Sequence, residues 1–439
     1  MRCHRGAGIS TRLSTVHDRG MSHQDPSSAV DLCRFIDSSP SPYHAVDEAA
    51  RRLSEAGFVE IGQDDDSPKP GRHLVRSGGA LVAWVDHGRA DDAPVRIVGA
   101  HTDSPNLRLK PVPDRDAAGC RQLGVEVYGG VLLNSWLDRD LGISGRLAVR
   151  DGDDVRQVLV RDDRPLARIP QLAIHLDRGV NEKGLVLNPQ DHLSPIIGTG
   201  GSTPGGFAAL MASAAGVPED AVLGWDVMFH DLSPSVLAGT NRDLVSAPRI
   251  DNLLSCHAGT QALAATAESD GPVPVLALFD HEEVGSVSSS GAAGPLLRRT
   301  LRRFVALESR RISGSLILSV DGAHATHPNY VDRHDPEHPV HMNSGPVLKF
   351  NAGERYATDA EGAGVVRLAA ERAGVPLQSF VSRGDLPCGT TIGPVTAAAT
   401  GIRTVDLGVA QLAMHSARET CGSADPGHLQ ALLVELLSG

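Results

Sequence analysis

Hydrophobic and polar positions follow two alternating patterns that predict an α/β fold over much of the chain. Short apolar runs predict buried strands, and helical spacing of apolar residues predicts helices between them. The predicted strands cover residues 95–100, 273–279, 315–320, 376–381 and 402–407, and the predicted helices cover residues 252–267, 296–307 and 360–373. Since strands alternating with helices are typical of parallel sheets, we expect an α/β domain with a mostly parallel sheet flanked by helices.

The pattern changes between Leu107 and Asn241. The strings VEVYGG, GRLAVR and VRQVLV are short β-like runs broken by turn residues. In LGWDVMFHDL, the apolar residues Leu223, Trp225, Val227 and Phe229 alternate with their neighbours, which predicts a half-buried strand. We therefore predict a β-rich domain at 107–241 that interrupts the α/β domain, whose two parts are residues 28–106 and 242–439.

Two segments fall outside this scheme. Residues 1–27 lack the apolar core of a secretory signal, so we expect a disordered extension or a misassigned start. The segment Gly198–Gly206 (GTGGSTPGG) lacks the G-K-[ST] ending of a phosphate-binding loop and follows no clear strand. It therefore predicts a mobile surface loop rather than a nucleotide site.

Composition excludes several classes of partner. The formal net charge of −12 argues against nucleic acid, which requires a basic surface. No apolar stretch reaches the ~18 residues that cross a membrane, so no membrane partner is expected. The six cysteines are scattered without a C-x-x-C pair, which is typical of free thiols in a cytoplasmic protein.

Histidines and carboxylates follow four of the predicted strands. In an open parallel sheet the ligand crevice lies beyond the carboxyl ends of the strands. Taken singly, each residue also fits a surface pair, a helix cap or a solvated turn, but their joint placement predicts a metal site. The candidates are His101 and Asp103, Glu282 and Glu283, Asp321, His415, and Asp251 just ahead of a predicted helix.

The adjacent acids Glu282 and Glu283 predict two different roles. In an extended strand one of them would point into the core, so we expect both on the loop that follows. One carboxylate could bind an ion while the other handles a proton. Five ligands of mixed type suit two ions better than one, because a single catalytic zinc takes about three protein ligands. The single-zinc signature H-E-x-x-H is absent, since Gly285 stands where its second histidine would be.

Eight strings spread over most of the chain carry a family resemblance. They are AHTDSPNLRLKP (100–111), RIPQLAIHLDR (168–178), RIDN (249–252), DHEEVGS (280–286), HATHPNY (324–330), PVLKFNAGERYAT (346–358), TIGP (391–394) and LGVAQLAMHSARE (407–419). Through them the sequence resembles the aspartyl aminopeptidase family of dizinc metallo-aminopeptidases. The resemblance implies a zinc-peptidase α/β domain, interrupted by a β-rich dimerisation domain.

The resemblance also implies a role for each candidate residue. Asp251 would bridge two divalent ions, zinc in the family, although Co²⁺ or Mn²⁺ would also fit such ligands. His101 and Asp321 would complete one ion, and Glu283 and His415 the other. Glu282 would be the general base, and Asp103 would orient His101. The implied substrate-binding residues are His175, His324, Lys349 and Tyr356, with His175 reaching the active site of a neighbouring subunit.

The implied activity is removal of the N-terminal residue of a peptide, with a preference for Asp or Glu. A metal-bridged water would be activated by Glu282, and dimers would assemble into a tetrahedral dodecamer. Two other functions remain open: another dizinc amidohydrolase, such as a carboxypeptidase or deacylase, and a catalytically silent assembly protein. Without the resemblance, Lys349 would predict a surface lysine, Tyr356 a core or hydrogen-bonded tyrosine, and His175 a core histidine.

Overall fold

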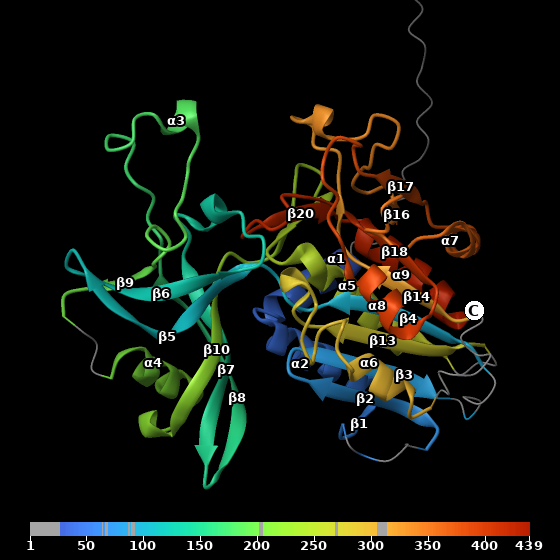
Figure 1. Ribbon diagram of the computed structural model, residues 1–439, viewed down its shortest axis with the longest axis horizontal. Coiled ribbons are helices and arrows are strands. Elements are labelled where there is room, and N and C mark those ends of the chain that lie inside the picture. Colours follow the sequence, from blue (N-terminus) through green and yellow to red (C-terminus); the bar gives the residue numbers. More distant parts are fainter. Residues whose placement is uncertain are drawn as a thin grey trace, which may run out of the picture.

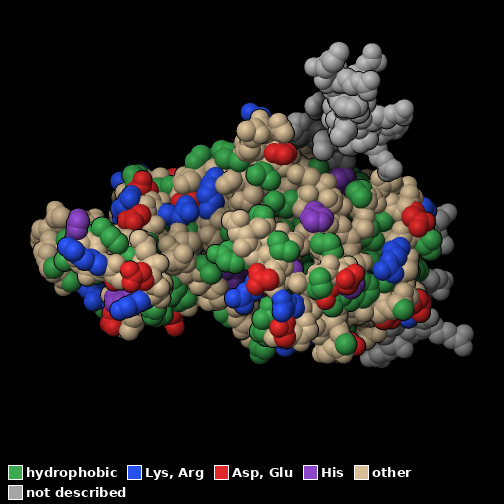
Figure 2. All heavy atoms as spheres, turned by 90° about the horizontal axis from the view of Figure 1, so that it is seen from above, with side chains coloured by type: hydrophobic (Ala, Val, Ile, Leu, Met, Phe, Trp, Pro, Cys, Tyr) green, Lys and Arg blue, Asp and Glu red, His purple; other side chains and the backbone are tan. Residues whose placement is uncertain are grey.

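The computed structural model describes residues 27–439 except 64, 66–68, 87, 89–92, 202–204, 268–270 and 305–313. Figure 1 shows a helix-covered sheet on one side and a β-rich part on the other. In Figure 2 the β-rich part is the smaller lobe, and acidic and basic side chains are interspersed on the visible face. The prediction for residues 1–27 lies outside the described residues, apart from Ser27, where helix α1 (Ser27–Ser38) begins.

A nine-stranded sheet forms the centre of the α/β part. Its four middle strands lie side by side and run parallel: β13 (Val273–Phe279), β4 (Val95–His101), β14 (Leu316–Val320) and β18 (Thr404–Gly408). One edge adds β3 (Ala80–Asp86), β2 (Gly71–Ser77) and β1 (Val59–Glu60), and the other adds β16 (Val347–Phe350) and β17 (Gln378–Val381). The predicted α/β class with a mostly parallel, helix-flanked sheet is confirmed.

The sheet is buried on both faces, as strand β13 illustrates. Its alternate side chains enter two different hydrophobic clusters, with Leu276 and Leu278 on one face and Val275, Ala277 and Phe279 on the other. The first face is covered by α1, α2 (Pro42–Glu55), α5 (Ile250–Ala265), α7 (Ala360–Ala373) and α9 (Asp425–Ser438), and the second by α6 (Leu296–Leu301) and α8 (Ile392–Thr400).

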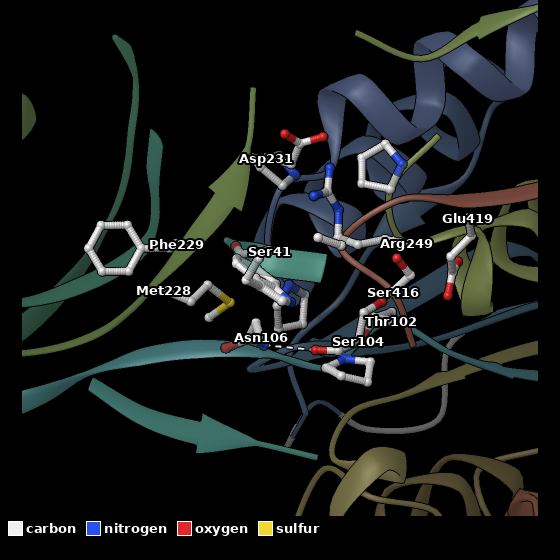
Figure 3. Close-up of a pocket in the computed structure, with 16 residues that line it drawn as sticks. Ser41, Thr102, Ser104, Asn106, Met228, Phe229, Asp231, Arg249, Ser416 and Glu419 are labelled. Carbon is white, nitrogen blue, oxygen red and sulfur yellow. Dashed lines mark hydrogen bonds between the residues drawn. The ribbon is translucent and has the colours of Figure 1, made fainter. Parts of the chain in front are cut away.

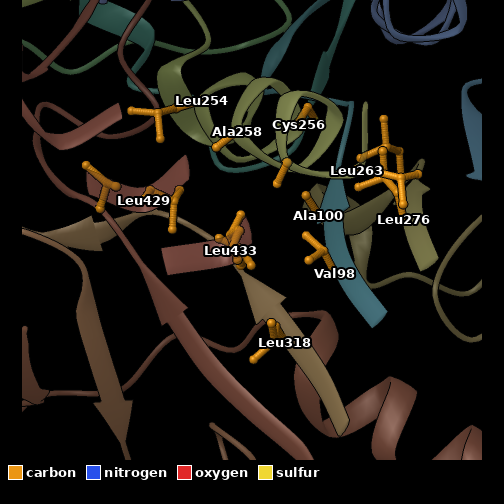
Figure 4. Packing of buried hydrophobic residues seen from close by; sticks show 14 of the residues in the cluster. Val98, Ala100, Leu254, Cys256, Ala258, Leu263, Leu276, Leu318, Leu429 and Leu433 are labelled. Atoms are coloured by element: carbon orange, nitrogen blue, oxygen red, sulfur yellow. The ribbon is translucent and has the colours of Figure 1, made fainter. Parts of the chain in front are cut away.

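Leucines of α5 and α9 contribute much of the packing on the first face. Figure 4 shows Leu263 of α5 next to Leu276 of the sheet, and Leu433 of α9 above Val98 and Leu318. Each fully buried leucine stabilises the fold by roughly 1.5–3 kcal/mol relative to an exposed one. This packing fixes the sheet from which the candidate ligands project.

The β-rich part is a six-stranded sheet whose neighbouring strands run antiparallel. Its strands are β5 (Asn106–Ala117), β6 (Cys120–Tyr128), β7 (Leu141–Asp151), β8 (Asp154–Ala167), β9 (Ile196–Thr199) and β10 (Val222–Asp231), with the short helix α3 (Val180–Lys183) and helix α4 (Gly206–Ala215) between β8 and β10. The domain boundaries at 107 and 241 and the dimerisation role of this segment stay predictions.

Two expectations for this part were wrong. Strand β10 does not alternate as predicted: Leu223 is exposed, while Met228 and His230 are buried together with Val227 and Phe229. The second half of the strand is covered on both faces, because Val227 and Phe229 pack in the core of the β-rich part while Met228 lines a small cavity toward the α/β part.

The segment Gly198–Gly206 does follow a strand, since β9 ends at Thr199. Helix α4 begins at Gly206, and residues 202–204 lie outside the described residues.

A third, five-stranded sheet lies beside the other two. Its order is β11 (Val236–Ala238), β12 (Leu244–Ala247), β20 (Glu419–Gly422), β19 (Ala410–Leu412) and β15 (Ala323–His324). Strands β12 and β20 pair antiparallel, so segments about 170 positions apart in the chain meet here. Across the described residues, the structure contains no helix long and apolar enough to cross a membrane.

Candidate metal centre and active site

Three adjacent parallel strands bring four acidic or histidine side chains to one edge of the central sheet. His101 is the last residue of β4 and pairs in register with Phe279, the last residue of β13. Beyond β13 the chain forms a short 3-10 helix, Glu282–Val284, and Asp321 follows directly after β14. The carboxyl ends of parallel strands therefore gather these groups, as the sequence pattern predicts.

The other two candidate ligands come from the third sheet. Asp251 lies in the first turn of α5, just beyond β12, with non-helical backbone angles and a cis peptide bond to Asn252. His415 lies in the loop between β19 and β20 with a positive φ of 66°. Pairing of β12 with β20 brings these two residues together.

Asp251 lies between the two histidines. Its Oδ1 is 3.3 Å from His101 Nε2, and its Oδ2 is 3.4 Å from His415 Nε2. On one side, His101 Nε2 is also 3.6 Å from Asp321 Oδ1. On the other side, His415 Nε2 is 3.3 Å from Glu283 Oε2. The five residues thus form two groups that share one carboxylate.

Both imidazoles are oriented through their other ring nitrogen. His101 Nδ1 lies 2.9 Å from the carbonyl oxygen of Asp103, and His415 Nδ1 lies 3.0 Å from that of Gly130. A carbonyl oxygen only accepts, so each Nδ1 carries the proton and each Nε2 is free to bind a cation.

Asp103 connects His101 to the two adjacent glutamates. Its Oδ1 accepts the backbone N–H of Glu282 and its Oδ2 that of Glu283, both at 3.1 Å. Tyr128, at the end of β6 in the β-rich part, donates its hydroxyl to the same Oδ2 at 2.7 Å. The Asp103 side chain is fully buried, so these bonds fix the position of the Glu282–Glu283 turn.

Burial and mutual charge shift the pKa values of this cluster strongly. Burial, together with the carboxylates of Asp321 and Asp103, raises the pKa of Glu282 to about 8. Burial and the Asp251 charge raise the pKa of Glu283 well above its usual value. Burial opposes ionisation of Asp251, but the neighbouring imidazoles of His101 and His415 hold its pKa well below the usual range. A group of buried acids this close requires positive charge nearby.

The donor set fits divalent cations. Within the described residues, ligand atoms close enough to share an ion occur in three groups: His101–Asp251–Asp321, Asp251–Glu283–His415 and His101–Glu282–Glu283. Two buried carboxylate oxygens there, Asp251 Oδ1 and Glu283 Oε1, accept no hydrogen bond. Buried oxygens of this kind are costly unless they coordinate a cation.

A cavity of about 220 Å³ opens over these groups. Three of the four predicted substrate-binding residues line it: His324, Lys349 and Tyr356. Lys349 and Tyr356 are buried, and Lys349 Nζ lies 5.3 Å from the centre of the Tyr356 ring. The same Nζ is 3.8 Å from Asp321 Oδ2, so Lys349 faces a candidate metal ligand as well as the open cavity.

His175 is not brought to this cavity within the chain. It lies between β8 and α3, and Figure 1 shows α3 on an arm that projects from the β-rich part. The residue is exposed, and Leu172, Ile174 and Leu176 around it are 59%, 48% and 74% exposed. The alternative of a core histidine is therefore wrong, because the segment packs against no core in the single chain.

Sequence reasoning missed three contributors to the site: Tyr128, Gly130 and Glu419. Tyr128 and Gly130 hold the orientation of Asp103 and His415 from the β-rich part, and Glu419 bonds to the backbone of two candidate ligands. Their strings, VEVYGG and LGVAQLAMHSARE, carry a β-strand pattern and the family resemblance respectively, and neither singles out these residues. No local spacing marks these residues, because each acts on a segment distant in sequence or through backbone groups.

The fold and this cluster of histidines and carboxylates define a metallohydrolase, and comparison with known proteins narrows the class. The family model described as aminopeptidase I zinc metalloprotease (M18) matches residues 35–435. The chain therefore belongs to the M18 family of zinc metallo-aminopeptidases. The family resemblance and the enzyme class predicted from the sequence are confirmed.

Known proteins are similar to this chain over nearly its whole length. The "Probable M18 family aminopeptidase 2" of Streptomyces coelicolor is 52% identical over 434 residues, which cover 96% of this chain and 98% of the relative. Among solved structures, a chain in the complex of Ape4 and Nbr1 is 36% identical with a TM-score of 0.89, covering 94% of this chain and 85% of that one. The yeast mApe1 dodecamer is 29% identical with a TM-score of 0.80, covering 93% and 96%.

Proposed function

We propose that the protein is a dizinc aminopeptidase that removes N-terminal Asp or Glu from peptides. The observation that carries the two-ion proposal is the shared position of Asp251, between His101–Asp321 on one side and Glu283–His415 on the other. A carboxylate with one oxygen directed to each side suits two neighbouring ions. Zinc agrees with the family description, and Co²⁺ or Mn²⁺ would fit the same ligands.

The residues present would divide into ligands and reacting groups. Asp251 would be shared, His101 and Asp321 would hold one ion, and Glu283 and His415 the other. When bound, the ions would supply Lewis-acid chemistry that polarises the scissile carbonyl and acidifies water. Glu282 lies close to His101 and Glu283 but forms no ion-sized group with the shared ligand Asp251, so we assign proton transfer to its carboxylate.

Glu282 would act as the general base and then as the general acid. Burial and the neighbouring carboxylates raise the pKa of Glu282 above the usual range of a carboxyl group, toward the neutral pH at which one group can accept a proton and return it. Glu282 takes a proton from the attacking water and passes it to the leaving amine. Asp103 keeps Glu282 in place through the 3.1 Å bond to its backbone N–H.

The substrate would lie against His324, Lys349 and Tyr356 in the 220 Å³ cavity. Lys349 is the residue best suited to pair with an acidic side chain, because it is a buried cation that faces this space. The Tyr356 hydroxyl or the His324 ring could donate to the oxyanion that forms on the scissile carbonyl.

Assembly into a homo-oligomer is also proposed. The mApe1 relative was solved as a dodecamer, and the exposed leucines and isoleucine around His175 form an apolar arm that a partner subunit would cover. In a dodecamer built from dimers, His175 would enter the active site of a neighbouring subunit. Size measurement by light scattering tests the assembly.

One assay tests the proposed reaction. Peptides that begin with Asp, Glu or Leu are offered with a free amine or with an acetylated amine to the zinc-loaded enzyme. We expect cleavage of free-amine peptides only, with the acidic residues cleaved fastest. Cleavage of acetylated peptides at a similar rate would contradict an aminopeptidase, and faster cleavage of Leu peptides would contradict the acidic preference.

A further inference from the structure

Glu419 is a buried carboxylate that contacts two candidate metal ligands without being a candidate ligand itself. Its Oε2 accepts the backbone N–H of Asp251 at 2.9 Å, and its Oε1 accepts the backbone N–H of His415 at 2.7 Å. The residue is 2% exposed. Neither oxygen belongs to any ion-sized group found within the described residues.

The strand pairing explains why one side chain reaches both ligands. Glu419 begins β20 and pairs with Ala247, the last residue of β12. Because the strands run antiparallel, the chain leaves this end of the pair in two directions: forward from Ala247 to Asp251, and backward from Glu419 to His415. Each ligand lies four positions beyond the pair, and the Glu419 side chain extends between them.

Both ligand N–H groups need such a partner. Asp251 has non-helical backbone angles at the first turn of α5, and His415 has a positive φ, so neither lies in a regular helix or strand ladder. A buried N–H without an acceptor is costly, and a carboxylate accepts charge-assisted bonds that are stronger than neutral ones. With one oxygen for each N–H, Glu419 sets the spacing between the two backbones.

The groups around Glu419 leave its two oxygens to the backbone N–H groups of Asp251 and His415. Glu419 lines a cavity of about 20 Å³ between the α/β and β-rich parts, close to the size of one water molecule. Figure 3 shows Arg249 and Ser416 beside it, and Asp231 farther along the same cavity. The Arg249 guanidinium donates to the carbonyl oxygens of Ser39 and Ile36 instead, at 3.1 and 3.3 Å.

We propose that Glu419 is a positioning residue for the metal centre: it holds the backbones of Asp251 and His415 at the distance that allows two ions to bind. The inference rests on the proposed two-ion site. Loss of Glu419 should affect the two ions unequally, because His415 belongs to one group of ligands while Asp251 belongs to both. The ion held by Asp251, Glu283 and His415 should depend on Glu419 more strongly than the other.

The test uses Glu419→Gln, which keeps the size of the side chain but replaces one acceptor oxygen with an NH₂ donor. The matched control is Asp231→Asn, a buried carboxylate on the same cavity that bonds to Arg139 and Ser233. Metal-free full-length proteins are titrated with Co²⁺, and binding of the ions is monitored by calorimetry and by visible absorption. Thermal unfolding of each metal-free protein reports on folding.

We expect wild type and Asp231→Asn to bind two Co²⁺ ions with the same spectrum. Glu419→Gln should bind the first ion nearly as tightly but the second about 10–100-fold more weakly, with an altered spectrum. Unchanged binding of both ions by a folded Glu419→Gln protein would overturn the inference, as would equal weakening in Asp231→Asn. If Glu419→Gln does not fold, Glu419→Asp keeps both oxygens on a shorter side chain and should show the same selective loss. Fewer than two ions in wild type would instead contradict the two-ion proposal.

Discussion

The hydroxyl of Tyr128 donates a 2.7 Å hydrogen bond to Oδ2 of Asp103, and this bond joins the β-rich part of the chain to the candidate metal centre. Asp103 in turn accepts the backbone N–H groups of Glu282 and Glu283. A residue of the inserted segment therefore helps to position both the candidate base and a candidate ligand. The β-rich part contributes to the site as well as to the proposed assembly.

Tyr128→Phe should weaken the site without unfolding the protein. The ring would keep its place under Arg108, whose guanidinium lies 3.6 Å from the ring centre. Loss of one bond to Asp103 should lower metal affinity and kcat by about 10-fold each, the lower end for partners of ligating residues. Zinc titration and steady-state kinetics measure the effects. Tyr43→Phe is the control, since the Tyr43 ring packs under Arg146 in the same way, at 4.2 Å, and an equal loss there would contradict the role of the Tyr128 hydroxyl.

Lys349→Met should reduce cleavage of acidic substrates more than cleavage of leucyl ones. A charge-assisted hydrogen bond to the substrate is worth about 1.5–3 kcal/mol, so kcat/KM for Asp and Glu peptides should fall about 10–100-fold. The half-buried Lys110, which bonds to Gln190 outside the site, provides a control in Lys110→Met. Equal loss for both substrates would contradict the specificity role and indicate that Lys349 acts through Asp321, 3.8 Å away.

His175 offers a test of shared active sites. Because His175 is exposed in the single chain, His175→Ala should fold normally but lose activity. Glu282→Gln should also be inactive. Co-expression of the two variants with different tags should produce mixed oligomers that regain activity, since some sites would combine a normal His175 with a normal Glu282. Mixed oligomers no more active than the two variants measured separately would contradict a role for His175 in a neighbouring site.

The ion pairs of Asp31 should make the folded protein less stable in acid. Asp31 Oδ2 accepts bonds from His257 at 2.7 Å and Arg52 at 2.6 Å, and these hold the pKa of Asp31 well below its usual value. A carboxylate with a depressed folded pKa adds stability above its unfolded pKa of about 3.9 and loses it as pH falls further. Asp31 is partly exposed, so Asp31→Asn should cost only about 1 kcal/mol at pH 7.

Urea unfolding at pH 7 and pH 3 checks this expectation. The difference between wild type and Asp31→Asn should shrink at pH 3, where Asp31 becomes protonated in the unfolded state. A difference that stays constant with pH would assign the effect to packing. Asp385→Asn is a suitable comparison, because Asp385 pairs with Arg383 on the surface and touches no buried histidine.

Much of the α/β part could be predicted from the sequence because its local signals agree with its packing. The sequence predicts a helix at 360–373, and helix α7 begins and ends at the same residues. Asp359 caps its start and Gly374 its end. Helix α8 was not predicted, because the residues of IGPVTAAAT are mostly small and form no apolar stripe. Burial of Ile392 and Thr396 stabilises this helix in the structure. Helix α9 was also missed, although Leu429, Leu432, Leu433 and Leu436 repeat at helical spacing.

The candidate ligands were found because strand ends mark them. His101, Asp321 and the Glu282–Glu283 pair all follow apolar runs, and the structure brings them together with Asp251 and His415. The contributions of Tyr128 and Glu419 could not be found in this way. The contribution of Glu419 depends on the pairing of β12 with β20, which lie about 170 positions apart in the chain. Tyr128 lies in the β5–β6 hairpin, whose register shifts between Leu109 and Asp114, so its place near Asp103 cannot be counted from the turn.

The most direct test of the account compares Glu282→Gln with Glu283→Gln, because the residues are neighbours in the chain but have different proposed roles. Metal content by mass spectrometry and turnover of an aspartyl peptide are measured on the same preparations. Glu282→Gln should keep two ions and lose about 10²–10⁴-fold in kcat, as expected when a general base is removed. Glu283→Gln should keep one ion. A Glu282→Gln enzyme that turns over at nearly the wild-type rate, or that loses an ion as Glu283→Gln does, would contradict the assignment.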